Sequence, residues 1–111
     1  MVGIMKFCSE RVLHYLREPK DGLVATMRNW LYRVNQRVVL RGCDGSVIGY
    51  GIVIDVAPTT PENLRRWLKY SGFNSVEEWI SEARKLNKGL PQFVCLVYII
   101  CLLYTSPSPR D

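Results

Sequence analysis

Metal-binding patterns are the first feature that these 111 residues lack. The cysteines Cys8, Cys43, Cys95 and Cys101 form no C-x-x-C pair, and the single histidine, His14, has no ligand partner near it in sequence. Zinc sites are built from closely spaced cysteine and histidine pairs, so we expect no metal. The scatter of the cysteines is typical of a reducing compartment, in which each is a small apolar residue rather than half of a disulfide.

The chain also has few long apolar stretches. Its longest apolar run, 93–104, has about a dozen residues, whereas a membrane helix needs about 20. No apolar run follows a basic start at the N-terminus, so no signal peptide is predicted. Neither a Ser-His-Asp set nor a glycine-rich phosphate loop is present. We therefore expect a cytoplasmic protein with no cofactor and no membrane partner.

Acidic residues are missing from one stretch, 23–43, in which positive charge gathers. This stretch contains four arginines, in a chain whose net charge is +5. Guanidinium groups bind phosphate in bidentate fashion, and aromatic rings stack on unpaired bases. We therefore predict that the stretch binds RNA, and the predicted binding residues are Thr26, Arg28, Trp30, Tyr32, Arg33, Arg37 and Arg41.

Each of these residues also has a purely structural interpretation. Arg37 and Arg41 share one face of a predicted strand, where charged side chains discourage pairing with other chains. Trp30 and Tyr32 could pin a loop to the core instead of stacking on bases. Thr26 could hydrogen-bond a ligand or could simply be a residue with high strand propensity.

Alternating apolar residues and turn signals predict the strands. Asp44-Gly45 is typical of a tight hairpin, and Gly49 and Gly51 in the return strand indicate a bulge or a sharp bend. The predicted strands are 1–7, 23–28, 37–41, 47–56 and 93–100.

Capping residues and helical spacing predict three helices. Ser9, Thr60 and Ser75 are expected N-caps. Trp67 and Trp79 lie on the apolar stripes of the last two helices and are predicted to be buried. The result is an α+β domain around a small, mostly antiparallel sheet with flanking helices.

The chain resembles the ASCH domain family of the PUA-like superfamily at four places that together span nearly all of residues 5–100. Lys6-Phe7 before a short helix is similar to the family's opening. Thr26-Met-Arg28 resembles the end of its Gly-x-Lys-x-x-Thr-x-Arg signature. Residues 35–40 with 48–53 resemble its barrel hairpin, and 71–79 resembles its Gly-Phe-x-Ser-x-Glu-Glu stretch. The resemblance implies a small PUA-like β-barrel that binds RNA.

Some ASCH members hydrolyse N4-acetylcytidine with the signature lysine, the signature threonine and a downstream glutamate, and ribonuclease activity is also associated with the family. Here Thr26 matches, but Leu23 occupies the lysine position. The nearest amine is Lys20, and the helix expected to supply the glutamate offers Glu62. Lys20 and Thr26 are therefore the catalytic candidates if the chain is a small hydrolase, and the mismatches argue against an enzyme.

The last eleven residues, 101–111, differ in character from the rest. They resemble a sequencing-library adapter translated in one frame, although a natural Ser/Pro-rich tail has a similar composition. We therefore expect a domain over 1–100, with its natural C-terminus missing. A further alternative is a protein-interaction domain that docks through the apolar final strand.

Overall fold

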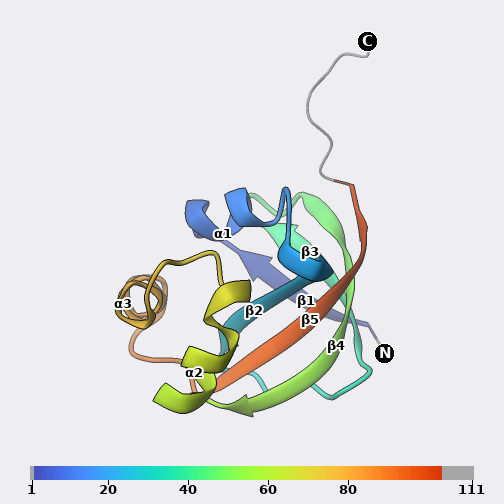
Figure 1. The fold of residues 1–111 in the computed structure, drawn as a ribbon. Coiled ribbons are helices and arrows are strands. Elements are labelled where there is room, and N and C mark those ends of the chain that lie inside the picture. Colours follow the sequence, from blue (N-terminus) through green and yellow to red (C-terminus); the bar gives the residue numbers. More distant parts are fainter. Residues whose placement is uncertain (1, 104–111) are drawn as a thin grey trace.

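Five strands form one mixed sheet within residues 2–103, the part of the chain that this computed structural model describes. The first strand pairs in parallel with the third, and all other neighbours are antiparallel. The expectation of a mostly antiparallel sheet is thus correct. In spatial order the strands are β1 (Gly3–Phe7), β3 (Arg37–Gly42), β4 (Val47–Pro58), β5 (Phe93–Leu102) and β2 (Leu23–Arg28) (Figure 1).

The sheet curves into a half-barrel, with β1 and β2 at its two edges. A small β-barrel was expected, and the structure confirms the curvature but does not close the barrel, since no pairing joins β1 to β2 in residues 2–103. The helix between these strands in the chain is α1 (Glu10–Tyr15). Its Val12 packs against both clusters of the hydrophobic core.

The predicted bend in the return strand is confirmed at Gly51. The register between β4 and β5 shifts between Tyr50 and Gly51 and again between Val53 and Asp55. A Cβ atom at Gly51 would lie only 2.7 Å from a methyl carbon of Val97. Glycine at this position therefore lets β5 approach the bent part of β4.

Three N-caps begin the helices where the sequence predicts them. The side chains of Ser9, Thr60 and Ser75 accept hydrogen bonds from backbone amides three residues later. The remaining helices are α2 (Pro61–Trp67), which continues as the short 3₁₀ helix η2 (Leu68–Tyr70), and α3 (Val76–Leu86). A further 3₁₀ turn, η1 (Lys20–Gly22), precedes β2.

Strand β2 and the first part of β5, 94–97, are buried on both faces, which explains why these sequences are almost continuously apolar. Val24 and Val97 face the interior of the half-barrel. Their neighbours Ala25 and Leu96 face the helices, together with the buried Trp67 and Trp79. The prediction that both tryptophans are core residues is confirmed.

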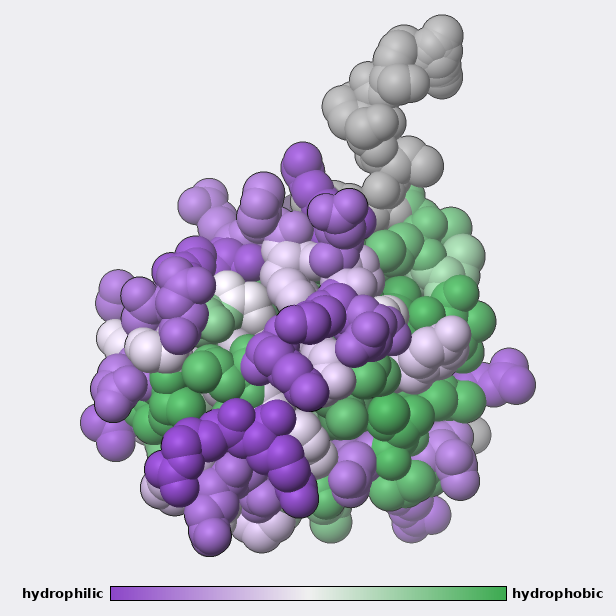
Figure 2. Space-filling model, in the orientation of Figure 1, coloured by the Kyte–Doolittle hydropathy of each residue, from purple (hydrophilic) through white to green (hydrophobic). Residues whose placement is uncertain are grey.

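Beyond the part covered by the helices, the outer side of the half-barrel carries exposed apolar residues. Figure 2 shows apolar surface gathered over β4 and β5, and the exposed side chains there are Tyr50, Ile54, Tyr98 and Ile100. Within residues 2–103, no helix has the length and apolar character needed to span a membrane.

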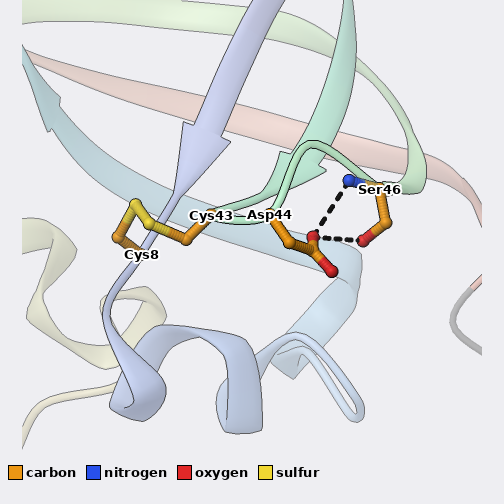
Figure 3. The surroundings of a disulfide bond; sticks show 4 residues. All are labelled: Cys8, Cys43, Asp44 and Ser46. Atoms are coloured by element: carbon orange, nitrogen blue, oxygen red, sulfur yellow. Dashed lines mark hydrogen bonds between the residues drawn. A yellow bond between two sulfur atoms is a disulfide. The ribbon is translucent and has the colours of Figure 1, made fainter.

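One expectation about the cysteines is wrong, because Cys8 and Cys43 form a disulfide (Figure 3). They lie 35 residues apart in sequence. The parallel pairing of β1 with β3 ends at Phe7 and Gly42, so the two cysteines that follow lie side by side. Among the described residues, Cys95 is buried and Cys101 is exposed, and both are free thiols.

The segment 101–111, expected to derive from an adapter, falls partly within β5, which continues to Leu102. The rest of it, from residue 104 on, lies outside the described residues.

Candidate functional site

A cavity of about 390 Å³ opens where β1 and β2 end and where α1 and α3 approach them. Its volume lies within the range usual for small-molecule sites. The wall combines aromatic rings with charged and polar side chains. The lining residues of β1, α1 and β2 are Lys6, Phe7, Cys8, Val12, Thr26, Met27 and Arg28. Those of the following loop and the α3 region are Asn29, Trp30, Tyr32, Phe73, Trp79, Glu82, Ala83, Leu86 and Asn87.

Arg28, the last residue of β2, is held in the cavity wall from two directions. Its Nε atom donates a hydrogen bond of 3.2 Å to Oγ1 of Thr26. Its guanidinium carbon lies 4.7 Å from the centroid of the Phe7 ring, in cation–π geometry. Burial lowers the pKa of Arg28, while Tyr32 and Cys95 act in the opposite sense. Arginine nevertheless stays charged at neutral pH, so the cavity contains a partly desolvated cation.

The two aromatic residues predicted for base stacking lie in different environments. Trp30 is 71% exposed at the rim of the cavity. Tyr32 is 7% exposed and belongs to the core of the half-barrel. Its hydroxyl donates a 2.7 Å hydrogen bond to the backbone carbonyl of Ile4, and burial raises its pKa. The loop-pinning interpretation therefore fits Tyr32, whereas the ring of Trp30 is open to solvent at the rim.

The other three arginines of the basic stretch are not among the lining residues. Arg33 and Arg37 are exposed, and Arg41 is half-buried. In β3 Val38 and Leu40 point into the core, so Arg37 and Arg41 lie together on the opposite, outer face. The prediction that they share one face of a strand is confirmed. Arg41 donates to the backbone carbonyl of Gly45 across the hairpin. The basic stretch is therefore divided between the cavity and the outside of the sheet.

Two residues considered for hydrolysis lie outside the cavity. They are Lys20 on the η1 turn and Glu62 at the start of α2. Lys20 is exposed, and its backbone amide donates to the hydroxyl of Tyr15, 3.1 Å away. Glu62 is exposed in the first turn of α2. Neither residue lines the cavity, whereas Thr26 does.

The sequence reasoning missed two charged residues that do line the cavity, Lys6 and Glu82. Lys6 comes from the end of β1, and its Cα partner in β3 is Arg41. Glu82 follows the buried Trp79 by three residues and so shares its face of α3. That spacing was the signal that could have identified Glu82, while Lys6 stood out only as part of the stretch that resembles the ASCH opening and not as a site residue.

Cys95 lies beneath the cavity as the β5 partner of Thr26. It is fully buried, and burial raises the pKa of its thiol to about 11, with the nearby Arg28 charge acting in the opposite sense. A thiol with so high a pKa is neutral at pH 7 and is a poor nucleophile. Cys95 therefore belongs to the core and not to the reactive groups of the site.

Potential metal ligands do not cluster in the part of the chain that the structure describes. Among residues 2–103 there is no group of three or more His, Cys, Asp or Glu side chains suited to hold a metal ion. The cavity instead offers an amine, a guanidinium, a hydroxyl, amides and a carboxylate, which are hydrogen-bonding groups for a polar organic ligand.

Comparison with known proteins gives one relative in sequence and one fold. The chain matches no protein-family model. It is 32% identical, over 92 residues, to uncharacterized protein 105 of Sulfolobus islandicus rod-shaped virus 1, and the match covers 83% of this chain and 86% of that protein.

In structure, the chain is similar to crystal structures of two mutants of ZmASCH from Zymomonas mobilis. Each comparison has a TM-score of 0.57 at 13% sequence identity and covers 88% of this chain. The chain spans 66% and 68% of the length of these two structures. The fold is therefore ASCH-like, as the sequence motifs predicted.

Proposed function

This chain belongs to the family of uncharacterized protein 105 of Sulfolobus islandicus rod-shaped virus 1, and with its ASCH-like fold as a further premise we propose that it is an RNA-binding module. One unpaired base enters the cavity, and the neighbouring phosphates lie at its mouth. The outer arginines Arg33, Arg37 and Arg41 attract the RNA backbone from a greater distance. With RNA as its partner, the cytoplasm is the place where we expect the protein to act.

The observation that carries this proposal is the joint position of Arg28 and Trp30. A partly buried cation and a largely exposed indole ring line the same cavity. RNA recognition commonly combines stacking of a splayed-out base with polar contacts to its edges. Lys6 at the end of β1 adds a second cation, placed for a phosphate. An exposed tryptophan beside a polar cavity has little structural purpose, because it contributes almost nothing to the core.

A titration of fluorescently labelled single-stranded RNA tests the proposal, with Trp30→Ala and Leu31→Ala as a matched pair. Both residues are exposed and adjacent, but only Trp30 is among the cavity-lining residues. Loss of base stacking costs on the order of 1–3 kcal/mol. We expect Trp30→Ala to weaken binding about tenfold and Leu31→Ala to leave it nearly unchanged.

Salt dependence provides the second criterion of the same experiment. Contacts to phosphate release counterions, so the affinity must fall steeply as salt increases. Absence of binding at low salt, or equal losses in the two variants, would contradict the proposal.

A second candidate function, hydrolysis of a modified nucleoside, is favoured by one observation. Lys6, Thr26 and Glu82 line the same cavity, and they are the residue types that the ASCH resemblance assigns to the chemistry. Lys6 thus replaces Lys20 as the candidate amine. The test is release of cytidine from N4-acetylcytidine, with Lys6→Ala abolishing it and Lys20→Ala leaving it unchanged. If the wild-type protein gives no turnover, this candidate is excluded.

A further inference from the structure

The disulfide adjoins the wall of the cavity. Cys8 is a lining residue, while Cys43 is exposed at the start of the β3–β4 hairpin. Figure 3 shows the bond linking the end of β1 to the hairpin, beside the Asp44 carboxylate that accepts hydrogen bonds from Ser46. The bond joins the residue pair that directly follows Phe7 and Gly42 in the parallel pairing. It therefore fixes the end of an edge strand.

The neighbours of Cys8 in sequence form the same wall. Phe7, directly before it, supports the Arg28 guanidinium through its ring. Ser9, directly after it, caps α1 by accepting a hydrogen bond from the amide of Val12, which also lines the cavity. The disulfide thus ties to the hairpin a residue whose two neighbours, Phe7 and Ser9, support Arg28 and the start of α1.

This part of the molecule lies at the edge of the fold, although Met5 and Phe7 of β1 are buried in the core. β1 is five residues long and lies at the edge of the sheet, with β3 as its strand neighbour. α1 has six residues, none of which is classed as fully buried. Its links to the rest include an exposed Arg11–Glu78 ion pair and the hydrogen bond from the Tyr15 hydroxyl to the Leu23 carbonyl. Segments of this kind open locally with lower free energy than the core does.

We propose that the Cys8–Cys43 disulfide is a redox-sensitive clamp on the cavity. In the oxidised protein β1 and α1 hold the wall in its ligand-binding shape. In the reduced protein this wall opens while the β4–β5 part of the sheet stays folded. Disulfides are rare in reducing compartments, so a protein acting in one would meet donors able to release the clamp.

The chemistry requires a dithiol or two thiols as the reductant. A thiolate attacks the exposed Cys43 sulfur and forms a mixed disulfide, and the Cys8 thiolate leaves and takes up a proton. A second donor thiolate then attacks the donor sulfur of the mixed disulfide and releases Cys43. The protein gains two electrons and two protons, and the two donor thiols end as a disulfide.

Hydrogen–deuterium exchange at short labelling times tests the clamp without any ligand. It compares oxidised protein with protein reduced by dithiothreitol, in a Cys101→Ser background that removes the exposed free thiol. Mass spectrometry after thiol alkylation confirms the redox state. We expect deuterium uptake to rise several-fold in 3–16 on reduction and to stay unchanged in 94–99. Unchanged uptake in both segments, or an equal rise in both, overturns the proposal.

A Cys8→Ser/Cys43→Ser variant provides the matched control, because its uptake should equal that of reduced protein whether dithiothreitol is present or not. The consequence for RNA rests on the proposed function. We expect reduction to weaken RNA binding about fivefold or more, within the range usual for coupling between two sites. If no RNA binds while uptake in 3–16 still rises, the proposed function fails and the clamp stands.

Discussion

The two parts of the basic stretch behave differently although they are close in sequence. Arg28 at the end of β2 lies against an aromatic ring and a hydroxyl in a cavity. Arg33 and Arg37, only a few residues later, are exposed outside it. A charge in contact with a ring and partly removed from water interacts more strongly with a ligand than a charge in water does. Charge density along a sequence therefore identifies a region, whereas binding strength depends on which charges the fold partly buries.

The sharpest test of this difference is a pair of equivalent substitutions, Arg28→Gln and Arg37→Gln. We expect Arg28→Gln to weaken RNA binding by about 2 kcal/mol, the size of a hydrogen bond to a charged group. Arg37→Gln should cost less than about 0.5 kcal/mol, as is usual for exposed charges. Binding isotherms measure both, and thermal melting verifies that each variant is folded. Similar losses of binding free energy from the two substitutions would contradict the proposed difference between Arg28 in the cavity and Arg37 outside it.

Substitution at the bend that shapes the half-barrel should have an effect of nearly the same size, in this case on the stability of the fold. In Gly51→Ala the added methyl group would meet the Val97 side chain, and overpacking of this kind costs about 1–3 kcal/mol. Gly3→Ala is the control, because the nearest atom there is the flexible end of the Gln36 side chain. Urea unfolding should show a clearly larger loss of unfolding free energy for Gly51→Ala than for Gly3→Ala. If Gly3→Ala lowers the free energy of unfolding as much, the close approach of β5 to Gly51 does not explain the need for glycine there.

The core beneath Arg28 should respond to alkaline pH through Cys95. The thiol has a pKa of about 11 in the folded protein, above its ordinary value of 9.0. Above pH 9 the unfolded chain releases this proton first, so stability falls as pH rises from 9 to 11. The loss from this group is on the order of 1 kcal/mol at pH 10. Cys95→Ala should flatten the fall between pH 8 and 10 in denaturant unfolding, and an unchanged slope would contradict the assignment.

The smallest expected effect concerns salt dependence and separates the cavity mouth from the outer surface. Replacing one phosphate-contacting cation lowers the slope of log affinity against log salt by about one. We expect this change for Lys6→Gln, and almost none for Arg33→Gln. A larger change of this slope for Arg33→Gln than for Lys6→Gln would indicate that the RNA phosphates lie along the loop and not at the cavity mouth.

Local patterns in the sequence were sufficient for much of the fold. The caps at Ser9, Thr60 and Ser75 and the bend at Gly51 depend on neighbours in the chain or on the nature of one residue. For the same reason the strands were found within a few residues, because alternation and turn residues are local signals.

The wall of the cavity was harder to predict because it joins distant segments. The parallel pairing of β1 with β3 brings Cys8 beside Cys43, and nothing near either residue in sequence indicates this. Lys6 and Glu82 come from opposite ends of the chain and meet at one cavity. The exposure of Trp30 against the burial of Tyr32 likewise depends on how the loop packs on β1.

The way in which Arg28 is held has an entropic consequence for any ligand. Its side chain is already ordered by the Phe7 ring and the Thr26 hydroxyl before a ligand arrives. Freezing a long side chain on binding costs about 0.5–1.5 kcal/mol, and here most of that loss occurs during folding. Because Nε already donates to Thr26, the donors left for a ligand are those on the two terminal nitrogens. The hydroxyl of Thr26, having accepted one hydrogen bond, keeps its own proton to donate.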